Sequence, residues 1–339
     1  MNNNNSKRTD FSDWNIFSKW SIRKITFVAI LISISVVFTI IGVQIAPIVA
    51  IPTFKISFIG LPVKISGFIF GPLIGFIVGL ISDLISFIII PNIFNPLYTL
   101  ATTIDGVIAG IVGWLFVKFL KYYFGGEFRY TFLEAEIVKN KHKINDLIIQ
   151  NQEITPKIKK KIDSLKRKII FLGEKRKSIL INGTKSQLMN INLTTALIIL
   201  SIISLMIVWL IGFKIDESIL KQGVISNRVG IILSMLIGYA FMFIFLIVAR
   251  FKLKPSKYLI IVPIVIFSAL IELINVPLLS LADVISFTRG SSDDREKIFV
   301  FIFKHTLFSP VKIWFNMFII FFTYNIVAPL IYKNDDIYY

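Results

Sequence analysis

The chain has 339 residues, of which 55% are hydrophobic, and it combines a formal net charge of +17 with a complete lack of cysteine. A mean hydropathy of +0.77 and several apolar runs of about 20 residues, the length that crosses a hydrocarbon core, predict an all-α polytopic membrane protein. The lack of cysteine excludes disulfides, thiolate catalysis and cysteine-bound metal centres.

The positive charge is unevenly distributed along the chain. Lys and Arg cluster in the N-terminal arm, throughout Lys118–Lys185 and in Ala249–Lys257, whereas the other connections carry little basic excess. By the positive-inside rule we expect these basic segments in the cytoplasm and the other connections outside, in a multi-pass protein of the cell membrane. Nucleic-acid binding would need a basic surface on a folded soluble domain, so we expect no nucleic-acid partner.

The first predicted helix covers residues 24–46. The next apolar block, Ile56–Ile90, is too long for one comfortable crossing and too short for two full ones. Gly is common just past the end of a helix and Pro in the first turn of the next, so Gly71–Pro72 predicts a break. We therefore expect two short helices at 61–70 and 72–88, an outer loop at 91–96 and a returning helix at 97–119.

Small residues spaced four apart recur through these helices, a pattern that lets neighbouring backbones approach closely. The spacing predicts a compact bundle. The residues expected at helix contacts are Gly67, Gly71, Pro72, Gly75, Gly79, Gly106 and Gly110.

Residues 128–180 differ from the rest, because apolar positions such as Ile137, Ile162 and Leu172 recur at helical spacing among many charges. Thr155–Pro156 is a typical helix start, so we predict a cytoplasmic helical hairpin. Ten basic residues lie between residues 157 and 177, against two acidic ones. Three interpretations of this arm are open: it lies on anionic lipid, it contacts an acidic partner, or it is solvated without a partner.

Four further crossings are expected at 192–213, 228–250, 258–281 and 298–332. The resulting eight crossings put both termini in the cytoplasm. The predicted organisation is a cytoplasmic N-terminal arm (1–23), transmembrane helices 1–4 of the core (24–121), the basic hairpin insertion (122–190), two additional transmembrane helices (191–250), and the last two core helices with a cytoplasmic tail (251–339).

Polar residues in or beside apolar segments are costly in a bilayer, so they are candidates for function. Asp105 lies well inside its helix, and Lys64 is its nearest plausible counter-charge, while Glu272 and Asn275 are one turn apart on a single helix. Catalytic and metal-ligand constellations are missing from the sequence, so we expect neither an enzyme nor a cofactor. The residues predicted to bind substrate are Lys55, Lys64, Asn92, Asn95, Tyr98, Thr99, Asp105 and Asn275.

The stretch LPVKISGFIFGPLIGFIVGLISD, followed by PNIFNPLYTLATTIDGVIAG, resembles the substrate-binding (S) component of energy-coupling factor (ECF) vitamin transporters, in particular the folate-type branch. The resemblance covers residues 24–121 well and 258–333 moderately. The matching residues, in order, are Leu61, Pro62, Gly67, Gly71, Pro72, Gly75, Gly79, Asp83, Pro96, Thr99, Leu100, Gly106 and Gly110, with Asn275 matching in the penultimate helix.

The resemblance implies a six-helix bundle that tolerates the inserted hairpin and the two extra spans. It further implies a vitamin bound in a pocket open to the outside, and association with a transmembrane coupling subunit and two ATPase subunits. Asp105 stands where the branch often has a non-acidic residue, and an acid there repels a carboxylated vitamin such as folate unless Lys64 or Lys55 compensates. The alternative function is a membrane scaffold or interaction protein that acts through the basic cytoplasmic arm.

Overall fold

The computed structural model describes residues 22–45, 60–89, 95–125, 127–150, 155–214, 227–287 and 294–331, and no strand occurs among them. Seven helical segments of the described residues are long and apolar enough to cross a membrane, which confirms the all-α polytopic architecture. In chain order the elements are α1 (Ile22–Ile45), α3 (Leu61–Phe70), α4 (Pro72–Ile89), α5 (Pro96–Gly113), the π-helical turns η2 (Trp114–Leu120), α6 (Lys121–Gly125), α7 (Glu127–Ile149), α8 (Pro156–Trp209), the π-helical turns η3 (Leu210–Lys214), α10 (Arg228–Lys252), α11 (Pro255–Phe287) and α12 (Asp294–Ile331).

The chain breaks between α3 and α4 at the predicted position. Gly71 has a φ of 105°, a left-handed conformation that favours glycine, and its N–H donates to the carbonyl of Gly67 to cap α3. All ten residues of α3 are buried. Ten helical residues span about 15 Å, half of a hydrocarbon core of about 30 Å, so α3 alone is too short to cross.

Glycine lets the backbones of α3, α4 and α5 meet. A Cβ added at Gly67 or Gly75 would overlap the carbonyl of Gly106, and one added at Gly106 would overlap the backbone of Gly75. One added at Gly110 would overlap the backbone of Pro72. Gly79 faces α5 in the same way, with a Cβ there lying 2.9 Å from the Cα of Thr103. The apolar helices therefore pack at the distance of bare backbones, as small-residue contacts in lipid allow.

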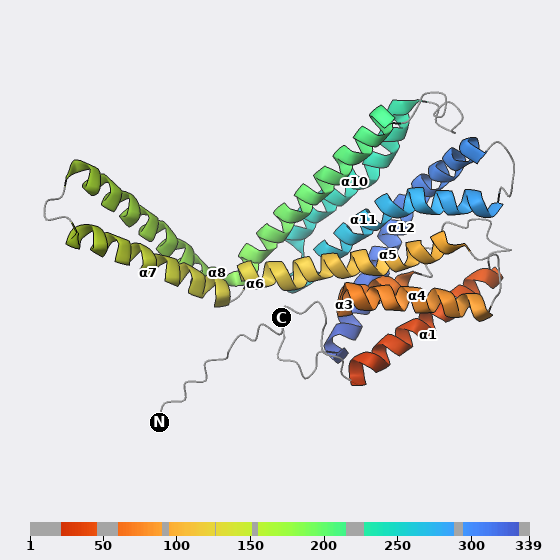
Figure 1. Ribbon diagram of the computed structural model, residues 1–339, viewed down its shortest axis with the longest axis horizontal. Coiled ribbons are helices and arrows are strands. Elements are labelled where there is room, and N and C mark those ends of the chain that lie inside the picture. Colours follow the sequence, from red (N-terminus) through yellow and green to blue (C-terminus); the bar gives the residue numbers. More distant parts are fainter. Residues whose placement is uncertain are drawn as a thin grey trace.

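One bundle is formed by α1, α3, α4, α5, α11 and α12, and α8 and α10 lie against it (Figure 1). Within the bundle α5 contacts α3, α4 and α11, α11 pairs with α12, and α1 covers α3 and α4. Of the apolar span of α11 83% is buried, although the helix contains Pro263 and Pro277, whereas only 28% and 22% of the spans Lys185–Phe213 and Arg228–Lys252 are buried. The helices at the two ends of the sequence thus enclose the polar interior, and the two additional helices are peripheral.

The predicted hairpin is formed by α7 and the first part of α8, which project beyond the end of the bundle as an antiparallel pair (Figure 1). Its α8 begins after Thr155 with Pro156 in the first turn, at the expected start. However, α8 continues without interruption through Trp209, so the boundary placed between residues 190 and 191 lies inside one helix of 54 residues. The expected span at 192–213 is the distal part of this helix and the η3 turns that follow it.

The helices of the arm pack in the manner of a coiled coil. Buried or half-buried positions along α8 are spaced alternately four and three residues apart, as in a heptad repeat. These positions are Ile158, Ile162, Leu165, Ile169, Leu172, Arg176 and Ile179. Leu133 and Ile137 of α7 pack against Leu172 and Ile179. The arm therefore has a core of its own outside the membrane bundle.

Candidate functional site

A buried ion pair joins α3 to α5. Lys64 Nζ lies 3.2 Å from Asp105 Oδ2, and the two side chains are 3% and 4% exposed. The second oxygen of Asp105 accepts a hydrogen bond of 2.6 Å from Asn275 Nδ2 on α11. Three helices distant in sequence thus meet at one carboxylate. The sequence-based choice of Lys64 as the counter-charge of Asp105 is confirmed.

A second buried ion pair joins α11 to α12. Lys312 Nζ lies 3.0 Å from Glu272 Oε2, and these side chains are 3% and 6% exposed. With Lys64 and Asp105 the cluster holds two cations and two anions, so its formal charge is zero. This balance matters because an unpaired charge away from water costs several kcal/mol, about 3–5 when one partner of a buried pair is removed.

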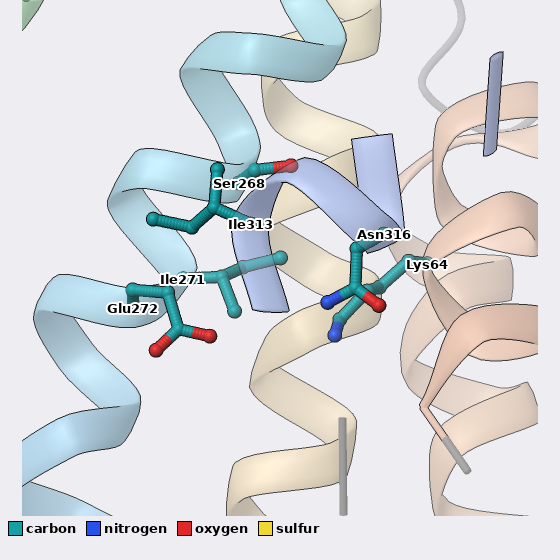
Figure 2. Close-up of a pocket in the computed structure, with 6 residues that line it drawn as sticks. All are labelled: Lys64, Ser268, Ile271, Glu272, Ile313 and Asn316. Carbon is teal, nitrogen blue, oxygen red and sulfur yellow. The ribbon is translucent and has the colours of Figure 1, made fainter. Parts of the chain in front are cut away.

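A narrow cavity lies between Lys64 of the first pair and Glu272 of the second (Figure 2). It has no space that admits a water-sized molecule, and the residues that line it, from α3, α11 and α12, are Lys64, Ser268, Ile271, Glu272, Ile313 and Asn316. Sites for small organic ligands are larger, about 300–1,000 Å³. Ser268 Oγ at the cavity and Asn275 Oδ1 beside Asp105 are buried and have no hydrogen-bond partner among the described residues. The site is closed but retains unused polar atoms.

A second polar group lies around the first turn of α5. Tyr98 donates a hydrogen bond of 2.5 Å to Asp283 Oδ1, and His305 Nε2 lies 3.0 Å from Asp283 Oδ2. These contacts join α5 to α11 and α12. Thr99 donates to Asp83 of α4, and Asn95 Nδ2 donates to the carbonyl of Ala282 at 2.9 Å. The N-terminal end of α5 is therefore fastened directly to α4 and α11, and through Asp283 to α12.

The residues predicted to bind substrate fall into three sets. Lys64, Asp105 and Asn275 meet at one point, and Asn95, Tyr98 and Thr99 belong to the polar group at the start of α5. Asn95 also caps α5, because its Oδ1 accepts from the backbone N–H of Leu97. Lys55 and Asn92 lie outside the described residues.

Sequence reasoning missed Lys312, Asp283 and His305. Each of these side chains is at most 3% exposed. Lys312 and His305 each pair with a residue of one other helix, and Asp283 pairs with residues of two other helices. Charge within an apolar helix was the available signal for Lys312 and Asp283, as it had been for Asp105. His305 has no partner at ligand spacing in the sequence, and its partner in the structure is a single carboxylate on α11.

The geometry defines a class of protein: a polytopic helical bundle with a closed, charge-balanced polar site in its interior. It offers positions for a polar molecule, and among the described residues no cluster of three or more His, Cys, Asp or Glu could hold a metal ion.

Residues 23–139 match the family model of the substrate-specific component of ECF transporters. The matched segment runs from α1 into α7 and includes both partners of the Lys64–Asp105 pair. The resemblance to ECF substrate-specific components is thereby confirmed for this segment, and it supports a substrate-binding subunit of a transporter. Comparisons with the curated proteins and with the solved structures gave no match.

Proposed function

We propose that this chain is the substrate-binding membrane subunit of an ECF-type importer. It captures a vitamin, folate or a related small molecule, from outside the cell and delivers it inward together with a transmembrane coupling subunit and two ATPase subunits. The observation that carries the proposal is that the segment matching the family contains the buried Lys64–Asp105 pair, which faces unused polar atoms from α11.

The chemistry of the buried cluster supports a ligand that has both anionic groups and hydrogen-bond donors. Lys64 and Lys312 can bind a carboxylate, and Asp105, Glu272 and Asn275 Oδ1 can accept from ring N–H groups. Folate has this combination, with carboxylates on its glutamate tail and N–H donors on its pterin ring. The repulsion expected between Asp105 and a carboxylated vitamin is countered by Lys64 at 3.2 Å.

Entry of such a ligand requires the site to open. The cavity has no space even for a water-sized molecule, whereas small-molecule sites hold about 300–1,000 Å³, so α11 and α12 have to separate from α3. The contacts of Tyr98 and His305 with Asp283 hold α5, α11 and α12 together at the start of α5. We assign these contacts the role of a latch that is released when substrate enters from the outer side.

The proposal is tested by direct binding. The protein is purified in detergent, small molecules that it retains are identified by mass spectrometry, and it is titrated with folate, riboflavin, thiamine and pantothenate. We expect one of them to be retained at about one molecule per chain. Lys64→Met should weaken its binding at least tenfold, whereas Lys139→Met, at an exposed position of the arm, should have no effect. A folded protein that retains and binds none of the four refutes the vitamin assignment.

A further inference from the structure

The two helices of the projecting arm differ in charge. Residues 156–181 of α8 contain ten Lys or Arg against Asp163 and Glu174, a net charge of +8, whereas α7 contains four basic and four acidic residues. Two of the basic residues bind α7, since Lys168 lies 2.8 Å from Glu136 and Arg176 lies 3.1 Å from Glu134. The Lys168 hydrogen bond lowers the pKa of the Glu136 carboxyl, which keeps it ionised.

Most of the positive charge of α8 is not used within the arm. Seven basic side chains are exposed and make neither an ion pair nor a ring contact with the described residues: Lys157, Lys159, Lys160, Lys161, Lys166, Arg167 and Lys177. The coiled-coil packing needs only the opposite face of the helix, so folding of the arm does not account for this charge. These like charges repel one another and lower the stability of the arm unless an anionic surface binds them.

An exposed apolar pair lies among these charges. Ile170 and Phe171 are 61% and 55% exposed, and Lys175 Nζ lies 4.6 Å from the centre of the Phe171 ring. Both residues lie outside the heptad seam that packs on α7, so the arm does not bury them. An apolar centre within a charged rim is the usual composition of a protein docking surface. We call residues 157–177 of α8 the basic face.

The position of the arm favours a protein over lipid as the partner of this charge. Lys157–Lys161 lie at the far tip, and the 21 residues from Lys161 to Ile181 of α8 cover about 30 Å of helix. Figure 1 shows the arm leading away from the bundle instead of folding back along its end. Attraction to anionic lipid falls off within a Debye length, about 8–10 Å at physiological salt, which is shorter than the stretch of helix between the tip lysines and the apolar span that begins at Lys185.

We propose that the basic face of α8 is a docking surface for an acidic, amphipathic helix of a cytoplasmic protein. The partner helix lies along the arm, places apolar side chains on Ile170 and Phe171, and pairs its carboxylates with the surrounding Lys and Arg. The inference does not rest on the transport function, because it uses no residue of the buried cluster.

The test uses the full chain in nanodiscs of neutral lipid and a fluorescent 21-residue helical peptide with Leu at heptad spacing and Glu elsewhere. Fluorescence anisotropy measures its dissociation constant, and a scrambled peptide of the same composition is the control for simple charge attraction. We expect the amphipathic peptide to bind at least tenfold more tightly than the scrambled one at 0.15 M salt, as an ordered apolar contact requires. Equal affinity for the two peptides overturns the proposal.

Two matched variants locate the surface. Lys159→Glu/Lys160→Glu/Arg167→Glu changes the charge of the basic face, and Lys139→Glu/Lys141→Glu/Lys143→Glu makes the same change of charge on exposed positions of α7. We expect at least a tenfold loss of peptide affinity for the first variant and less than a threefold loss for the second. Equal losses mean long-range attraction without docking. Phe171→Ser, compared with Val138→Ser on α7, tests the apolar contact in the same assay.

Lipid is tested separately. A fluorophore at position 160 is compared in neutral nanodiscs and in nanodiscs with anionic lipid, both with quenching groups on the lipid chains near the headgroup. We expect equal fluorescence in the two. Stronger quenching in the anionic nanodiscs assigns the basic face to the bilayer surface and overturns the protein partner. Circular dichroism of each variant checks that the arm remains helical.

Discussion

Removal of the negative charge at Asp105 should leave the Lys64 ammonium buried without its counter-ion. At 3.2 Å and an effective dielectric constant of about 20, the attraction between unit charges is about 5 kcal/mol. Loss of one partner of a buried pair costs about 3–5 kcal/mol in proteins, so the two estimates agree. Asp105→Asn keeps the shape of the side chain and one oxygen that can accept from Asn275. The free energy of unfolding should therefore fall by about 3–5 kcal/mol, mainly because the charge is lost.

Removal of the Lys64 charge as well should restore most of the lost free energy of unfolding. Lys64→Met/Asp105→Asn leaves neither charge unpaired, so the double variant should unfold within about 1 kcal/mol of the parent protein. The assay is equilibrium unfolding by SDS titration in detergent micelles, followed by circular dichroism, with the four proteins of the cycle compared. Strictly additive losses would refute the idea that these charges stabilise each other. The double variant should still fail to bind the vitamin, which separates binding from folding.

Three further outcomes are expected. Gly106→Ala should lower the unfolding midpoint markedly, since its Cβ overlaps the backbone of α4, while Gly173→Ala, where a Cβ meets nothing within 4 Å, should not lower it. Asn140→Leu should slow hydrogen exchange in the arm, because Asn140 is buried in the seam and a polar residue there fixes register at a cost in stability. Tyr98→Phe removes the hydrogen bond to Asp283, so substrate association in a stopped-flow assay should become faster if this contact is a latch; an unchanged rate contradicts the latch.

Local sequence patterns were sufficient to predict where several helices begin and end. Gly71–Pro72 predicted the break between α3 and α4 because only glycine readily adopts a φ of 105° and proline starts a helix without needing its N–H. Thr155–Pro156 predicted the start of α8 for the same kind of local reason. The continuation of α8 beyond the arm was not predictable in this way, because the pair Asn182–Gly183 is typical of a helix end and α8 nevertheless continues through it to Trp209.

The sequence also determined part of the site. A charge in an apolar helix must be paired, which was enough to single out Asp105 and to suggest Lys64. It was not enough to select Lys312 as the partner of Glu272 or His305 as a partner of Asp283, because those choices depend on which faces of α11 and α12 meet.

The amino-acid sequence by itself therefore determined that the chain lies in a membrane, which segments form helices and that Asp105 needs a partner. These properties depend on hydropathy, glycine and proline, which act over a few residues. Only the tertiary structure decided the partners of Glu272 and Asp283, the closure of the cavity and the continuity of α8 into the arm. The physical reason is that a buried ion pair depends on the distance between atoms of different helices. That distance is set by close contacts such as the one between Gly75 and Gly106.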